Sequence, residues 1–399
     1  MEEKNIFLEK SKNITNINNY DNKISVIKQA NNNDKKRKVR DSGIDLIRIL
    51  AMYAIIIHHI LVFPNIIDKY SKYKELVLMK TLCFWHVSGF ALISGYIGYK
   101  SNKYSNLLYL WICALFYSVG ITYFFQKYKP ITSKKLEYED FLPVYFDKYW
   151  YFTKYFGMYL FLPVINKGIA DLTKSELRFV VITLILVYIA LKDIINPNTD
   201  IFLMSNGYSV IWLLIFYLTG AYFGKFKKEY NEIKKIILSI MCILVFYFST
   251  FFCFYFSSYS HNNSEGIFKM KIMEYLKLLF VLRISSFPMI LQSISITLLL
   301  TNMKYNKYLI KIIVFLGPLT FGVYLIHMHK IIIRIIIEKL YLTEPYNLSL
   351  WAVIKYVLLK GALIFGICLI VEYFRHILFI FLRIRKICIF IEIFIHKLF

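Results

Sequence analysis

The chain has 399 residues, 58% hydrophobic and 18% aromatic, and its 49 Lys and Arg against 25 Asp and Glu give a formal charge of +24. This composition excludes a chain disordered over most of its length, and a water-soluble protein would expose apolar patches that it could not bury. The six cysteines have neither a disulfide framework nor zinc-ligand spacing, and no nucleic-acid-binding motif accompanies the basic residues, so an integral membrane protein with several spans remains.

Residues 1–42 differ in composition from the rest of the chain. They are rich in Asn, Lys and Asp, and they end in a basic cluster formed by Lys35, Lys36, Arg37, Lys38 and Arg40. A segment with so little apolar surface cannot offset the conformational entropy that is lost when it is ordered. We therefore expect a disordered basic tail on the cytoplasmic side of the membrane.

Ten apolar runs follow this tail, each close to the roughly 20 residues that a helix needs to cross a bilayer. They are expected near residues 44–63, 77–99, 107–125, 150–168, 177–195, 207–225, 236–257, 276–300, 309–331 and 351–371. Strands of a membrane barrel would instead show short alternating runs. The predicted fold class is thus an all-α bundle of about ten transmembrane helices, formed by residues 43–371.

The charged residues between the runs predict the orientation of the bundle. Lysine and arginine collect in alternate connections, for example at Lys225 and Lys227, whereas the opposite connections carry most of the acids, such as Glu137 and Asp140. The positive-inside rule then places both termini in the cytoplasm. Residues 372–399 mix Ile, Phe and Leu with Arg and Lys, which predicts a basic amphipathic helix on the inner leaflet.

The first apolar run carries four ionisable side chains, at Asp45, Arg48, His58 and His59. Such groups are costly within a membrane and are therefore functional candidates. At about 100° per residue, the steps from Arg48 to His59 make three turns plus about 20°, so the two share a helix face about 16 Å apart. A histidine there can act as a general base near neutral pH. One alternative is an interfacial role for Asp45 and Arg48, in which they pair with lipid headgroups or with each other. The other is a packed, hydrogen-bonded role for the histidines.

The spacing of Asp45, Arg48 and His59 resembles the start of the acyltransferase-3 family, which comprises multi-spanning membrane O-acyltransferases that often acetylate cell-surface polysaccharides. Later segments resemble further blocks of that family in the same order. These segments are Ser94-Gly95-Tyr96, Tyr149-Trp150-Tyr151-Phe152, Pro163 to Asn166, Phe216 to Phe223, and Phe321 to His327. Together they extend the resemblance from about residue 40 to residue 375.

The resemblance implies that His59 is the catalytic residue, that Arg48 contacts the acyl donor or a structural partner, and that Asp45 helps to orient or balance the site. It also implies acetyl-CoA or another acyl-CoA as donor substrate with no permanently bound cofactor, a glycan as acceptor, and the plasma (inner) membrane as location. One departure from the family pattern is that Lys100 and Lys103 stand where many members carry two arginines.

Other side chains are expected to contribute to substrate binding. They are His58, Ser94, Tyr96, Trp150, Tyr151, Asn166, Arg283 and His327. The small residues Ser88, Ala91, Gly95 and Gly98 share one face of their run, which predicts close packing against another helix. No metal site and no nucleic-acid partner are expected, and the oligomeric state stays open. A transporter or flippase of an anionic or lipid-linked substrate, using the same buried Arg and His, is the alternative function.

Overall fold

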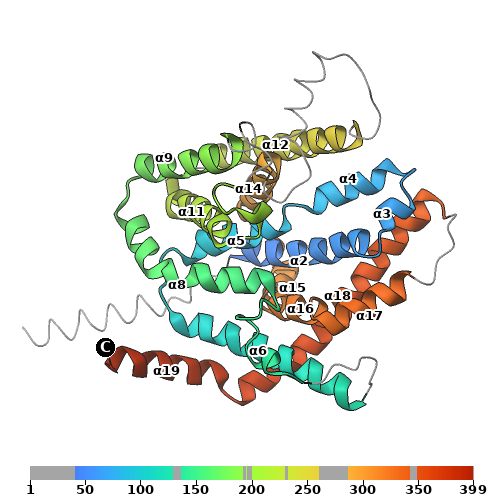
Figure 1. The fold of residues 1–399 in the computed structure, drawn as a ribbon. Coiled ribbons are helices and arrows are strands. Elements are labelled where there is room, and N and C mark those ends of the chain that lie inside the picture. Colours follow the sequence, from blue (N-terminus) through green and yellow to red (C-terminus); the bar gives the residue numbers. More distant parts are fainter. Residues whose placement is uncertain are drawn as a thin grey trace, which may run out of the picture. The chain divides into compact units, whose positions relative to one another are not determined.

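The computed structural model of this chain describes residues 41–128, 136–191, 195, 200–229, 232–259, 286–341 and 348–398. The expected tail at residues 1–42 therefore lies almost wholly outside the described residues. Over the described ranges the secondary structure is helical and contains no strand (Figure 1). The all-α fold class predicted from the apolar runs is confirmed for this part of the chain.

The first half of the fold runs from α2 to α9 along the chain. Its helices are α2 (Ser42–Val62), α3 (Ile66–Lys69), α4 (Lys74–Cys83), α5 (His86–Gly98), α6 (Tyr104–Tyr128), α7 (Tyr138–Phe141), α8 (Trp150–Asp171) and α9 (Lys174–Ile185). The second half contains α11 (Val210–Phe226), α12 (Glu232–Tyr259), α14 (Phe287–Asn302), α15 (Lys307–Leu316), α16 (Thr320–His327), α17 (Lys330–Tyr341), α18 (Leu350–Phe381) and α19 (Ile384–Leu398).

Six helical segments among the described residues are long and apolar enough to cross a membrane. They are Ser42–Val62, Lys74–Gly98, Tyr104–Tyr128, Lys234–Tyr255, Lys307–His327 and Leu350–Phe381. The predicted count of about ten is not confirmed, because α11 and α14 are apolar but shorter, and the run expected at 276–300 is described only from residue 286 onwards. Two of the six segments are also interrupted, since α4 gives way to α5 and α15 gives way to α16.

Local capping explains where several helices begin. The hydroxyl of Thr173 accepts a hydrogen bond from the backbone N–H of Glu176, whose carboxylate in turn accepts one from the N–H of Thr173. Ser209 caps α11 and Ser349 caps α18 in the same way, through the third residue of each helix. These side chains satisfy backbone donors that the first turn of a helix leaves without a partner.

Helices α5 and α11 cross at backbone contact. A methyl group placed on Gly95 would lie 1.8 Å from the carbonyl oxygen of Tyr217, and one placed on Gly220 would lie 1.9 Å from the carbonyl oxygen of Leu92. Only glycine allows two helix backbones to approach this closely. Gly95 and Gly98 of the predicted packing face both lie against Tyr217 of α11, which confirms the close packing there, and α5 also packs against α2 (Figure 1).

Helix α2 is surrounded by other helices. It packs against α4 and α5, against α14 and α15, and against α16 and α18, so most of its apolar side chains are buried. Its central place brings residues from distant parts of the chain next to its polar side chains. Helix α18 continues through residue 371 to Phe381, so the domain boundary expected at 371 falls inside a continuous helix.

Candidate active site

The polar side chains of α2 separate into two groups in the structure. Near the start of the helix, Arg48 donates a hydrogen bond to the Asp45 carboxylate, with 2.7 Å between Nη1 and Oδ1. Asp45 is fully buried, whereas the side chain of Arg48 is 26% exposed. Gly317 lies directly against Asp45, because a methyl group on Gly317 would come within 2.7 Å of Oδ1. The sequence alternative in which these two residues pair with each other is the arrangement found.

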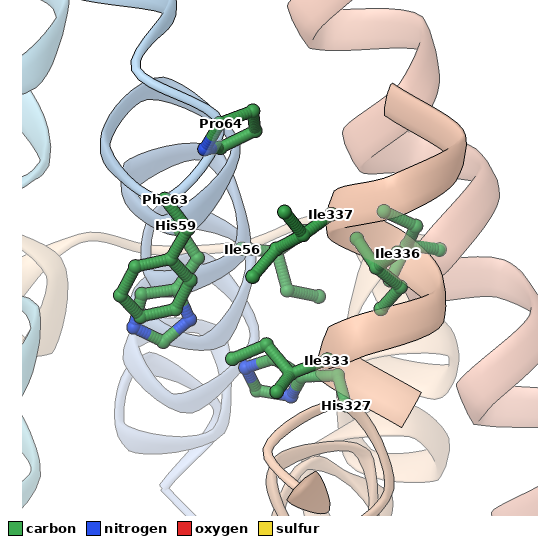
Figure 2. Close-up of a pocket in the computed structure, with 9 residues that line it drawn as sticks. Ile56, His59, Phe63, Pro64, His327, Ile333, Ile336 and Ile337 are labelled. Carbon is green, nitrogen blue, oxygen red and sulfur yellow. The ribbon is translucent and has the colours of Figure 1, made fainter. Parts of the chain in front are cut away.

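The second group surrounds a pocket at the other end of α2. His59 and His327 lie on its walls with Phe63 and Pro64, and isoleucines of α2, α17 and α18 complete the lining (Figure 2). The pocket has about 290 Å³ of space, part of it open to the surroundings. His59 stacks on Phe63, with ring centroids 4.5 Å apart and ring planes at 16°. The pocket is thus apolar apart from its two imidazoles.

Four histidines form a continuous row beside this pocket. The ring centroids are 5.4 Å apart between His86 and His58, 5.9 Å between His58 and His59, and 5.5 Å between His59 and His327. His86 comes from the first residue of α5 and His327 from the last residue of α16. Among the described residues, no group of three or more His, Cys, Asp or Glu could hold a metal ion.

The row is poorly satisfied by hydrogen bonds. The buried Nδ1 atoms of His58 and His59, the Nε2 atom of His327 and both ring nitrogens of His86 have no hydrogen-bond partner in the described part of the protein. A buried polar atom without a partner costs about 1–3 kcal/mol, and such atoms concentrate where a ligand or water completes the site. His86 was not among the predicted site residues, although its place beside Trp85 in an apolar run was a visible signal.

Aromatic side chains extend the site beyond His327. The ring of Tyr324 lies 6.3 Å from that of His327, and those of Tyr149 and Tyr151 lie 6.1 Å and 6.3 Å from Tyr324. The hydroxyls of Tyr149 and Tyr151 are buried without a partner among the described residues. Burial raises the pKa of Tyr149 well above its ordinary value, so its hydroxyl keeps its proton and can donate a hydrogen bond.

Other predicted binding residues lie apart from the pocket. Trp150 packs against Tyr208, with ring centroids 4.4 Å apart and ring planes tilted by 56°, and Tyr96 is buried beneath the ammonium group of Lys227. The hydroxyl of Ser94 donates to the carbonyl of Phe90, one helical turn earlier. None of these contacts includes a residue of the row of histidines.

Asn166 is occupied by the protein itself. Its amide nitrogen donates to Asn102 Oδ1 at 2.8 Å and to the carbonyl of Ser101 at 3.2 Å, while its oxygen accepts from the hydroxyl of Tyr217 at 2.8 Å. These bonds fix the connection between α5 and α6, which carries Lys100 and Lys103. The hydroxyl of Tyr159 adds a bond to the carbonyl of Lys103. Arg283 lies outside the described residues.

A buried ionic cluster was missed in the sequence. Glu372 and Arg375, both on α18, form an ion pair, and the hydroxyl of Tyr117 donates to Glu372 Oε2 at 2.6 Å. Arg375 also donates to the hydroxyl of Tyr109 at 3.0 Å. The sequence interpretation placed residues 372–399 in a surface helix, and nothing local to α18 reveals partners on α6.

Comparison with known proteins gives one family. The family described as "Acyltransferase domain" matches residues 41–373, which cover the polar helix α2, the row of histidines and most of α18. No curated protein and no solved structure matches the chain. The family match spans far more than half of the sequence and includes each block on which the resemblance was based. The chain therefore belongs to the acyltransferase-3 family of acyltransferases.

Proposed function

We propose that this protein is a membrane O-acyltransferase that transfers an acyl group, acetyl in the first instance, from acyl-CoA to a hydroxyl of a cell-surface or lipid-linked glycan. One observation supports it above the others. His59 lies on the wall of an apolar pocket, stacked on Phe63 and facing a second imidazole. A histidine held in this way suits general-base catalysis, because water is largely excluded and the ring has few orientations.

In the proposed reaction, His59 takes the proton of the acceptor hydroxyl while its oxygen attacks the thioester carbonyl. The carbon–sulfur bond then breaks, the ester forms, and the proton passes from His59 to the departing thiolate. The balance is the same if His59 first takes the acyl group and passes it to the acceptor. Asp45 and Arg48 keep the other end of α2 in place through their ion pair and contribute charge toward the donor.

The remaining assignments follow from this reaction. We place the protein in the plasma (inner) membrane with both termini in the cytoplasm, where acyl-CoA is made available. The clamped connection that carries Lys100 and Lys103 offers two cations for the phosphates of the donor. The predicted binding set, His58, Ser94, Tyr96, Trp150, Tyr151, Asn166, Arg283 and His327, is kept with this role, Asn166 acting through the connection that it holds.

The test is the ester content of the surface glycan in cells that carry the intact chain, His59→Ala or His58→Ala. Base-released acyl groups and proton NMR of the glycan measure it. We expect His59→Ala to lower the ester at least 100-fold at equal protein level, the size of a lost general base. His58 belongs to the predicted binding set but lies outside the pocket lining, so His58→Ala should lower the ester far less than His59→Ala does. Unchanged ester in His59→Ala would refute the assignment and favour a transporter of an anionic or lipid-linked substrate.

A further inference from the structure

The proton position of His327 is set by the backbone. Its Nδ1 lies 2.7 Å from the carbonyl oxygen of Val323, one turn earlier in α16. Because a carbonyl oxygen only accepts hydrogen bonds, Nδ1 must donate, and the lone pair of the neutral ring is then on Nε2. The residues that line the pocket include no carboxylate that would pair with a protonated ring.

Nε2 of His327 is buried and has no hydrogen-bond partner among the residues that the structure describes. Nε2 of His327 is therefore a hydrogen-bond acceptor whose lone pair has a fixed direction. His327 cannot easily turn away from this arrangement, because its Nδ1 bond and its neighbour Tyr324 hold the ring.

His59 offers the complementary feature. Its Nδ1 is also buried without a partner, so no described hydrogen bond decides which of its nitrogens carries the proton. Phe63 covers one face of the ring, which leaves His327 as the polar neighbour within the pocket. The two rings lie 5.5 Å apart with planes tilted by 36°, and Figure 2 shows a ring nitrogen of each turned toward the other.

We propose that His327 is a positioning residue for His59: a small rotation of the His59 ring lets one of its N–H groups donate to Nε2 of His327, closing a hydrogen bond that the static arrangement leaves unmade. This bond places the lone pair of His59 on its other nitrogen, where it can take the proton of the acceptor hydroxyl. Catalytic bases are commonly oriented by a third group in this manner. The effect on catalysis rests on the proposed acyl transfer, whereas the hydrogen bond itself does not.

The surrounding fold is built to hold His327 still. Helix α16 ends at His327 and α17 begins at Lys330, and the intervening His329 lies 3.4 Å from the hydroxyl of Thr122 on α6. That hydroxyl donates to Asp140 at 3.0 Å, and Asp140 is ion-paired with Lys148. A buried polar network therefore fixes the break between the two helices and with it the end of α16.

The decisive measurement is ¹⁵N NMR of the histidines in the purified full-length protein in lipid nanodiscs, with signals assigned by single substitutions. We expect His327 to be protonated at Nδ1 only, and His59 to show one tautomer. In His327→Leu, which removes the acceptor, His59 should become a mixture of tautomers. In His327→Gln, whose amide oxygen can accept, His59 should return to one tautomer.

The same variants are then assayed for release of free thiol from acetyl-CoA in the presence of the glycan. His327→Leu should lower kcat by about 10²–10⁴-fold with KM for the acceptor little changed, His327→Gln should recover part of kcat, and His376→Leu on α18 should match the intact protein. A single unchanged His59 tautomer in His327→Leu would overturn the proposal. Intact pairing with no thiol release by the unaltered protein would instead refute the proposed function.

Discussion

The buried carboxylate of Glu372 has two kinds of partner, a cation one turn later on its own helix and a phenol on another helix. Arg375 bonds to it through two guanidinium nitrogens, and Tyr117 bonds to it from α6. Gly322 of α16 lies against the same carboxylate, since a methyl group there would come within 1.9 Å of Oε2. The Glu372 side chain thus connects α6 and α18 with α16, the helix that ends at His327.

Removing only the cation of this ion pair should lower the stability of the protein more than removing both charges. Arg375→Met leaves a buried carboxylate without its counter-charge, which costs about 3–5 kcal/mol, whereas Glu372→Gln with Arg375→Met removes both charges and costs much less. Thermal unfolding of the purified proteins in nanodiscs measures the difference. The expected order of Tm is Arg375→Met lowest, the double variant above it, and the intact protein highest. Equal Tm values for the two variants would contradict it.

At this scale the sequence identified His59 but not its surroundings. The spacing from Arg48 and the position inside an apolar run singled out His59 without any structure. Its contact with His327 depends on how α16 returns to α2, which no local pattern encodes. Glu372 was overlooked for the same reason, because its cation is close in sequence but its phenol partner is on α6.

Among the elements, the crossing of α5 and α11 depends on glycine at three positions. Gly224 adds a third close contact, since a methyl group there would lie 2.1 Å from the carbonyl oxygen of Tyr96. In each case the obstructing atom is backbone, which cannot rotate aside. Gly120, in the middle of α6, has nothing within 4 Å of the same position and provides a natural control.

We expect Gly95→Ala to lower the yield of folded protein severely, because α5 and α11 must separate to admit the methyl group. Gly120→Ala should instead leave the yield unchanged or raise stability by about 0.5–1 kcal/mol, as alanine favours the helix. Size-exclusion chromatography of detergent extracts, followed by thermal unfolding, compares the two. Normal yield and Tm for Gly95→Ala would show that the crossing is looser than described.

The helices were predictable from apolar runs, but their interruptions were not. The run expected at 77–99 stays apolar through Phe84 and Trp85, where α4 ends and α5 begins, so hydropathy alone gave one helix. The run expected at 309–331 likewise contains α15, α16 and the start of α17. Hydropathy predicts the length of a segment in apolar surroundings, but it does not predict where the helix within that segment breaks or changes direction. The breaks in this second run define α16, whose last residue is His327, so they determine where His327 lies in the site.

For the molecule as a whole, the charge distribution predicts which connections share a side of the membrane. The six cysteines are all buried, so a membrane-impermeant maleimide should react only with an introduced, exposed thiol. Tyr145, between α6 and α8, is 83% exposed, and Lys100, between α5 and α6, is also exposed. In intact cells, Tyr145→Cys should be labelled from outside and Lys100→Cys only after permeabilisation, with the unsubstituted chain as blank. The reverse pattern would invert the proposed topology.

The backbone contact between α5 and α11 also has a mechanical consequence. Two helices that touch without side chains between them have little room to slide past each other, so we expect this crossing to resist shear. On the opposite side, α17 faces the pocket only through isoleucine side chains and joins α16 through a two-residue break. The network of Thr122, Asp140 and His329 holds that break, so we expect the isoleucine side chains, and not a whole helix, to move when the proposed acceptor hydroxyl reaches His59.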